Sequence, residues 1–76
     1  MTNDQKTMAR SLVQVAMVPG IPTKRFARDM ALRAEQAEPK PLTAAQAEYL
    51  RTAVIRYRKN IPAAVVALAE ALAPAP

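Results

Sequence analysis

Apolar side chains recur along the chain at intervals of three and four residues, a spacing that places them on one face of a helix. Proline-bearing clusters at residues 18–22, 38–41 and 60–62 separate four such segments. No run alternates with the period of two that is typical of a half-buried strand. The pattern therefore predicts helices of about 12–17 residues. Their apolar stripes are Met8, Leu12, Val15 and Ala16; Phe26, Met30, Ala34 and Ala37; Ala47, Leu50, Val54 and Tyr57; and Ile61, Val65, Leu68, Ala69 and Leu72.

Helix-start signals favour two positions. Thr43 followed three residues later by Gln46 fits a capping box, in which each side chain satisfies a backbone donor of the other residue. Leu42, just before this box, is suited to pack back onto the first turns of the third helix. Thr23 is the expected N-cap of the second helix.

Proline and glycine define the connections. Pro19-Gly20 suits the centre of a type II turn, where glycine accepts a positive φ. The connection between the second and third helices holds two prolines and is expected to span about five residues. These features predict an all-α fold: a small single-domain bundle of about four short helices over residues 1–73. A loose C-terminal tail is expected at residues 74–76.

Composition argues against catalysis. The 76 residues make one domain, and its hydrophobic fraction of 51% includes seventeen alanines, which bury little area. The chain has no cysteine and no histidine, so it lacks a thiolate and the usual general base at neutral pH. No cluster of carboxylates, lysines or hydroxyls replaces them. We expect a protein that is not an enzyme and that holds no cofactor and no metal.

The sequence indicates neither a leader nor a membrane span. The start carries Asp4, and the apolar run from Leu12 to Val18 is broken by Gln14. No stretch reaches the roughly 18 apolar residues that a spanning helix needs. A cytoplasmic protein without a membrane partner is the expectation.

Positive charge is concentrated in the centre of the chain. The net charge is +5 and the isoelectric point about 10.3, a balance that favours acidic partners. Eight of the eleven basic residues lie on the predicted second and third helices. The candidate binding residues are Lys24, Arg25, Arg28, Arg51, Tyr49, Arg56, Arg58 and Lys59.

For each group of basic residues, a structural role has to be weighed against a binding role. Arg56, Arg58 and Lys59 fall at the expected C-terminus of the third helix, where cations complement the negative end of the macrodipole. Their charge is explained equally well by that stabilisation and by binding. Lys24 and Arg25 stand at a helix N-terminus, where positive charge is unfavourable, so their position leans towards function.

Tyr49 lies off the apolar stripe of the third helix. It could stack on a base or anchor an interface. The favoured alternative packs it against residues 39–42 with its hydroxyl in water. Leu32 and Ile55 also fall off the stripes, and together they would form an apolar patch for a protein partner. Core positions are expected for Phe26, Met30 and Tyr57.

A helix–turn–helix reading of the second and third helices is weak. The turn is longer than usual, and the start of the third helix offers only Gln46 to a base edge. Its arginines cluster at the far end. This arrangement allows phosphate contacts but favours little sequence readout.

The segments KRFARDM, PLTAAQAEYL and RYRKNIP, between Lys24 and Pro62, resemble small proteins encoded by phages and prophages. In size and in its lack of catalytic residues the chain is also similar to the small RNA polymerase inhibitor of Xanthomonas phages. The resemblance implies a protein that acts by binding a host machine in the host cytoplasm.

Two hypotheses stay open. In the first, the basic helices bind an acidic face of a host complex and modulate or inhibit that complex. Host RNA polymerase is the leading candidate, and transcription would then be the process affected. A nucleic-acid-handling defence complex is another candidate. In the second, the chain binds nucleic acid through phosphate contacts. Homo-oligomerisation is a further open alternative, because the core is small and the fourth helix is strongly apolar.

Overall fold

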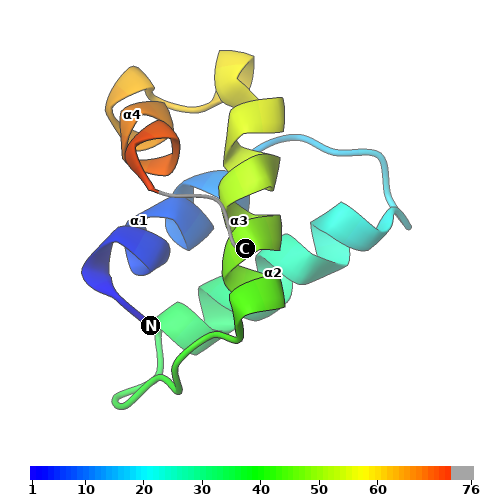
Figure 1. The fold of residues 1–76 in the computed structure, drawn as a ribbon. Coiled ribbons are helices and arrows are strands. Elements are labelled where there is room, and N and C mark those ends of the chain that lie inside the picture. Colours follow the sequence, from blue (N-terminus) through cyan, green and yellow to red (C-terminus); the bar gives the residue numbers. More distant parts are fainter. Residues whose placement is uncertain (73–76) are drawn as a thin grey trace.

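A computed structural model describes residues 1–72, and this part of the chain folds into four α-helices and one 3₁₀ turn, without a strand (Figure 1). The all-α prediction is therefore confirmed. The expected tail at 74–76, with residue 73, lies outside the described residues. The elements are α1 (Asn3–Leu12), α2 (Pro22–Ala34), α3 (Ala44–Arg56), the 3₁₀ turn η1 (Arg58–Asn60) and α4 (Ala63–Ala71).

Helix α1 is the centre of the bundle. It packs against α2, α3 and α4, and α3 also packs against α4. In Figure 1, α3 runs from the lower part of the molecule to the top, α1 and α4 lie to its left, and α2 crosses behind its lower half. The predicted stripes supply most of the core, because Leu50 and Val54 are fully buried and Met30 nearly so. Phe26 and Tyr57 are half-buried and pack against that core from its edge.

Two capping boxes start helices, and the one at Thr43 was predicted from the sequence. At α3, the Gln46 N–H donates to Thr43 Oγ1 at 3.1 Å, and the Thr43 N–H donates to Gln46 Oε1 at 3.0 Å. The same pair of bonds joins Thr2 and Gln5 at the start of α1, at 3.1 and 3.0 Å. Each box satisfies two backbone donors that a helix start leaves free.

Removing the cap of α3 gives a first test of this fold. Thr43→Ala should lower the free energy of unfolding by about 1 kcal/mol, because the Gln46 N–H loses its acceptor. Urea denaturation followed by circular dichroism measures the loss. Thr43→Ser keeps the acceptor oxygen and is the matched control. An equal loss in both variants would contradict a capping role.

The predicted N-cap of α2 is wrong. The helix begins at Pro22, and its cap residue is Ile21, in an extended conformation without a side-chain cap bond. Proline suits the first helical position and forces the preceding residue into the extended region. Thr23 therefore lies inside the first turn, and its hydroxyl is free to bond elsewhere.

The first helix is shorter than predicted. It ends at Leu12, and Ala16, expected on its apolar stripe, is exposed. β-Branched valines in the following residues lower the helix propensity. Val15 is buried all the same, although it lies beyond the helix. The turn that follows has Gly20 at a φ of 90°, as predicted for its glycine.

The second helix also ends early, at Ala34, and leaves Ala37 exposed. The connection to α3 therefore spans residues 35–43, longer than the five or so expected. Pro39 and Pro41 hold the residues before them extended, which prevents the helix from running up to the first proline. Leu42, at the end of this connection, packs against the core as expected.

Candidate binding interface

Helices α2 and α3 meet chiefly through side chains. Backbone packing between them is sparse compared with the packing of α1 against either helix. The rings of Phe26 and Tyr49 stack across the gap with centroids 4.3 Å apart and planes 28° from parallel. Further along, Arg33 Nη1 donates to Gln46 Oε1 at 3.4 Å.

Tyr49 is the centre of this contact. The favoured prediction packed it against residues 39–42 with its hydroxyl in water, and the structure gives it two other partners. Its hydroxyl shares a 3.0 Å hydrogen bond with the Thr23 hydroxyl, and its ring lies on Phe26. The residue still has 40% of its surface exposed. One ring face is therefore engaged within the chain, and the remaining surface is open to a partner.

Two open hollows meet at Ala45 and Tyr49, and together they form what we call the seam groove. The larger, of about 980 Å³, follows α3 from Ala44 to Arg56 and touches α2 at Thr23. The smaller, of about 520 Å³, lies between α2 and the first turn of α3. Its lining also includes Phe26, Asp29, Met30, Leu32, Arg33, Gln36 and Gln46.

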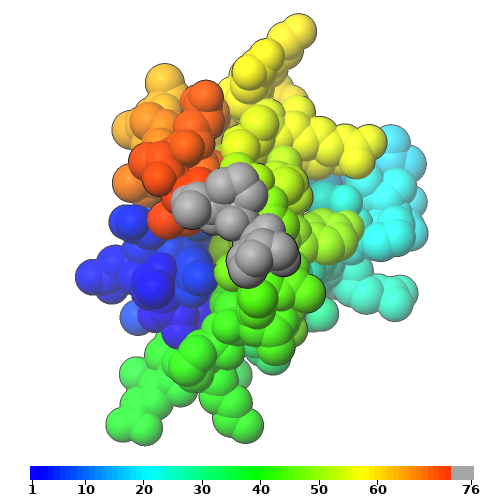
Figure 2. Space-filling view, viewed as in Figure 1, coloured from blue at the N-terminus to red at the C-terminus, as the bar shows by residue number. Residues whose placement is uncertain are grey.

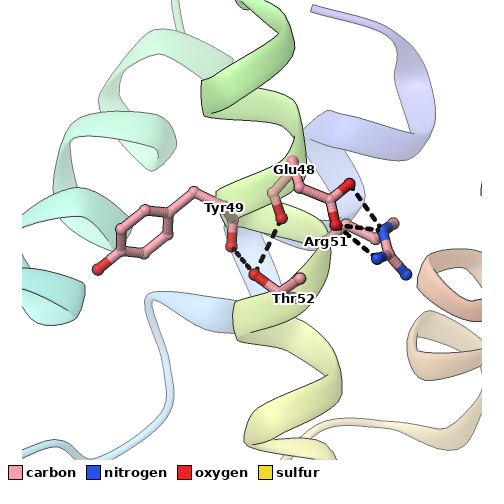
Figure 3. Close-up of polar contacts among 4 residues, drawn as sticks. All are labelled: Glu48, Tyr49, Arg51 and Thr52. Atoms are coloured by element: carbon pink, nitrogen blue, oxygen red, sulfur yellow. Dashed lines mark hydrogen bonds and ion pairs between the residues drawn. The ribbon is translucent and has the colours of Figure 1, made fainter. Parts of the chain in front are cut away.

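The floor of the seam groove is largely apolar. Ala45, Tyr49, Thr52 and Arg56 are spaced to share one face of α3, away from the buried Leu50. The Thr52 hydroxyl donates back to backbone carbonyl oxygens of its own helix, at 2.9 and 3.1 Å (Figure 3). With its hydroxyl satisfied in this way, Thr52 can offer its methyl group to the groove. No hydrophobic stripe in the sequence marks this face, so Ala45 and Thr52 were not among the predicted site residues.

Leu32 and Ile55, the apolar residues outside the predicted stripes, line different hollows of the seam groove. Leu32 is 63% exposed and lines the smaller hollow, whereas Ile55 is half-buried and lines the larger one. The predicted patch of the two is therefore not one continuous spot. Tyr49 lies between them, because it lines both hollows.

Arg51 is held by an ion pair. Its Nε donates to Glu48 Oε1 and Oε2 at 3.1 and 3.2 Å, and its side chain is only 15% exposed. The hydrogen bonds to Glu48 raise the pKa of Arg51 above its already high usual value, so the group stays cationic. In Figure 3 the guanidinium and the Tyr49 ring point to opposite sides of α3. Arg51 is thus a candidate that the structure does not bring together with Tyr49.

The basic residues at the start of α2 are accessible. Arg25 and Arg28 are exposed and Lys24 is half-buried, and all three line a hollow that shares Phe26 and Asp29 with the seam groove. Within residues 1–72 none of the three forms an ion pair. Their charge is therefore free to attract an anion.

The basic group at the end of α3 is split by the structure. Arg56 ends the helix and lines the seam groove, whereas Arg58 and Lys59 belong to η1, not to α3 as predicted. The helix ends sooner because Pro62 and the buried Ile61 require an extended segment after the turn. All three are exposed, and Figure 2 shows side chains of this yellow segment projecting from the upper end of the molecule.

Residues 1–72 contain no group of three or more acidic, cysteine or histidine side chains arranged to hold a metal ion. Within the same range, every helix is too short or too polar to cross a bilayer.

The chain matches no protein-family model, no curated protein and no solved structure. The candidate interface therefore rests on its own geometry: an exposed tyrosine in an apolar groove, with Arg56 at one end and the basic start of α2 beside it.

Proposed function

We propose that this chain is a non-catalytic, phage-type binding protein that docks its α2–α3 face on an acidic surface of a host macromolecular complex and modulates or inhibits that complex. The observation that carries the proposal is the combination of unpaired cations and an exposed aromatic groove on one face. Interfaces of proteins are enriched in tyrosine and arginine at the positions that contribute most to affinity. Long-range attraction between the basic face and an acidic partner would also speed association.

Host RNA polymerase is the leading candidate target, and host transcription the process affected. This choice rests on the similarity of the chain, in size and in its lack of catalytic residues, to the small RNA polymerase inhibitor of Xanthomonas phages. A nucleic-acid-handling defence complex that presents an acidic surface is the other candidate target. The expected place of action is the host cytoplasm.

Affinity capture from a bacterial lysate tests the proposal. After treatment with nuclease, the immobilised protein should retain one stoichiometric protein complex, with the subunits of RNA polymerase as the expected set. Added to purified RNA polymerase, the chain should then lower the yield of a single-round transcription reaction. Recovery of nucleic acid alone, with no protein left after nuclease, would overturn the proposal.

Binding to nucleic acid is the second candidate, favoured by the exposed cations Arg25, Arg28, Arg56, Arg58 and Lys59. It predicts that the logarithm of the affinity for duplex DNA falls linearly with the logarithm of salt concentration, with a slope of about −0.9 per phosphate contact. Fluorescence anisotropy with a labelled duplex measures the slope. We expect weak binding at physiological salt, because phosphate contacts alone typically give a Kd of about 10⁻⁴–10⁻⁶ M. Tight binding at physiological salt would reverse the order of the two candidates.

A further inference from the structure

We propose that the seam groove receives a short acidic amphipathic helix of the partner protein, antiparallel to α3. The inference rests on the proposed function and adds the chemical nature and orientation of the partner segment. It follows from the length of the groove, its lining and the charges at its ends.

The lining of the seam groove offers no place for strand addition by an extended peptide. Strand addition needs an exposed sheet edge with unpaired backbone groups. The groove is walled by α2 and α3, whose backbone groups are bonded within each helix, so it offers no such edge. A helix suits such a groove, because its backbone groups are bonded internally and its side chains alone make the contacts.

The dimensions suit about three helical turns. From Ala45 to Arg56 a helix rises about 16 Å, at about 1.5 Å per residue. Ala45 and Thr52 are small, which lets a second helix approach α3 closely, and Tyr49 stands between them as an anchor. Apolar residues of the partner at i, i+4 and i+7 would reach Ile55, Tyr49 and Leu32 in turn.

Charge sets the partner's acidity and direction. Arg56 stands at the C-terminal end of α3 without an ion-pair partner in the described range, and Arg33 lines the other hollow. The lining also holds Glu48, which is paired with Arg51, and Asp29, which shares the neighbouring hollow with three cations of α2. Acidic side chains are favoured in the first turn of a helix, where the macrodipole is positive. A partner helix with its first turn against Arg56 therefore runs antiparallel to α3. A second copy of this chain is a poor occupant, because each copy carries a net charge of +5.

Nuclear magnetic resonance with a synthetic probe tests the groove directly. The probe is a capped helical peptide of about 16 residues, with leucines at i, i+4 and i+7 and glutamates in its first turn. Its control has the same composition with the leucines spread around the helix. The probe should shift the amide signals of Leu32, Tyr49, Thr52, Ile55 and Arg56, and the control should not.

Matched variants distinguish binding in the seam groove from nonspecific binding to the protein surface. Leu32→Ser should weaken probe binding about tenfold, whereas Val18→Ser should leave it unchanged. Both leucine and valine are exposed, at 63% and 69%, and only Leu32 lines the groove. Arg56→Glu should weaken binding similarly, and Lys40→Glu, a reversal outside the groove, should not.

Three outcomes would overturn the inference. The first is failure of the peptide test: either the probe peptide shifts no amide signals of the groove at millimolar concentration, or the two peptides bind equally well. The second is a single-stranded oligonucleotide that shifts the same signals at lower concentration, which would assign the groove to nucleic acid. The third is capture of the host complex that is insensitive to Leu32→Ser, in which case the proposed function stands and the groove is not its site.

Discussion

Replacing Leu50 with alanine should lower the free energy of unfolding by about 3 kcal/mol, within the range of about 2–5 kcal/mol for buried leucines. Leu50 is fully buried in α3, the helix that packs on both α1 and α4. A domain of 76 residues has about 4–11 kcal/mol of stability in all, so this one change should unfold a large share of the molecules on warming. Urea and thermal denaturation measure the loss.

Leu32 is the matched control, because it is the same residue type on the surface. Leu32→Ala should change the free energy of unfolding by about 0.5 kcal/mol at most. Similar losses in the two variants would mean that the core is not centred where α3 meets α1. The contrast also shows that Leu32 can be changed for binding experiments without unfolding the protein.

Reversing three exposed arginines should abolish most partner binding. Arg25→Glu, Arg28→Glu and Arg56→Glu together place negative charge at the start of α2 and at one end of the seam groove. With about 1 kcal/mol lost at each position, affinity should fall roughly a hundredfold, chiefly through slower association. Surface plasmon resonance with the captured complex, at low and at physiological salt, measures both rates.

The chain offers a control of equal charge. Lys6→Glu, Arg10→Glu and Lys40→Glu change the same number of charges but lie outside the two basic segments. Arg10 forms an exposed ion pair with Glu35, which contributes little to stability, and a urea denaturation curve checks that this control stays folded. Each triple variant lowers the net charge from +5 by six units, to −1. If both bind equally weakly, total charge and not the α2–α3 face governs the interaction.

Local signals in the sequence were sufficient for the fold class. The stripes around Leu50 and Val54 and the capping box at Thr43 predicted α3 well, because helical periodicity and caps are short-range properties. The capping box at Thr2 has the same spacing to Gln5 and was overlooked. Helix ends were predicted less well, since proline, valine and tertiary burial compete there.

The candidate interface was only partly predictable. The exposed arginines and the off-stripe position of Tyr49 are visible in the sequence. The stacking of Tyr49 on Phe26 is not visible there. It depends on the distance between α2 and α3, which is set by the packing of both helices on α1, and the hydrophobic periodicity of a sequence does not give distances between helices. The ion pair of Arg51 with Glu48, three residues apart on one helix, could have been predicted from spacing alone.

Hydrogen–deuterium exchange on the nuclease-treated complex tests most directly whether a protein partner occupies the α2–α3 face. Free and bound protein would be compared peptide by peptide. Slower exchange in α2, α3 and η1, with α4 unchanged, is the predicted result. A footprint confined to α4, or the loss of the complex when nucleic acid is removed, would contradict it.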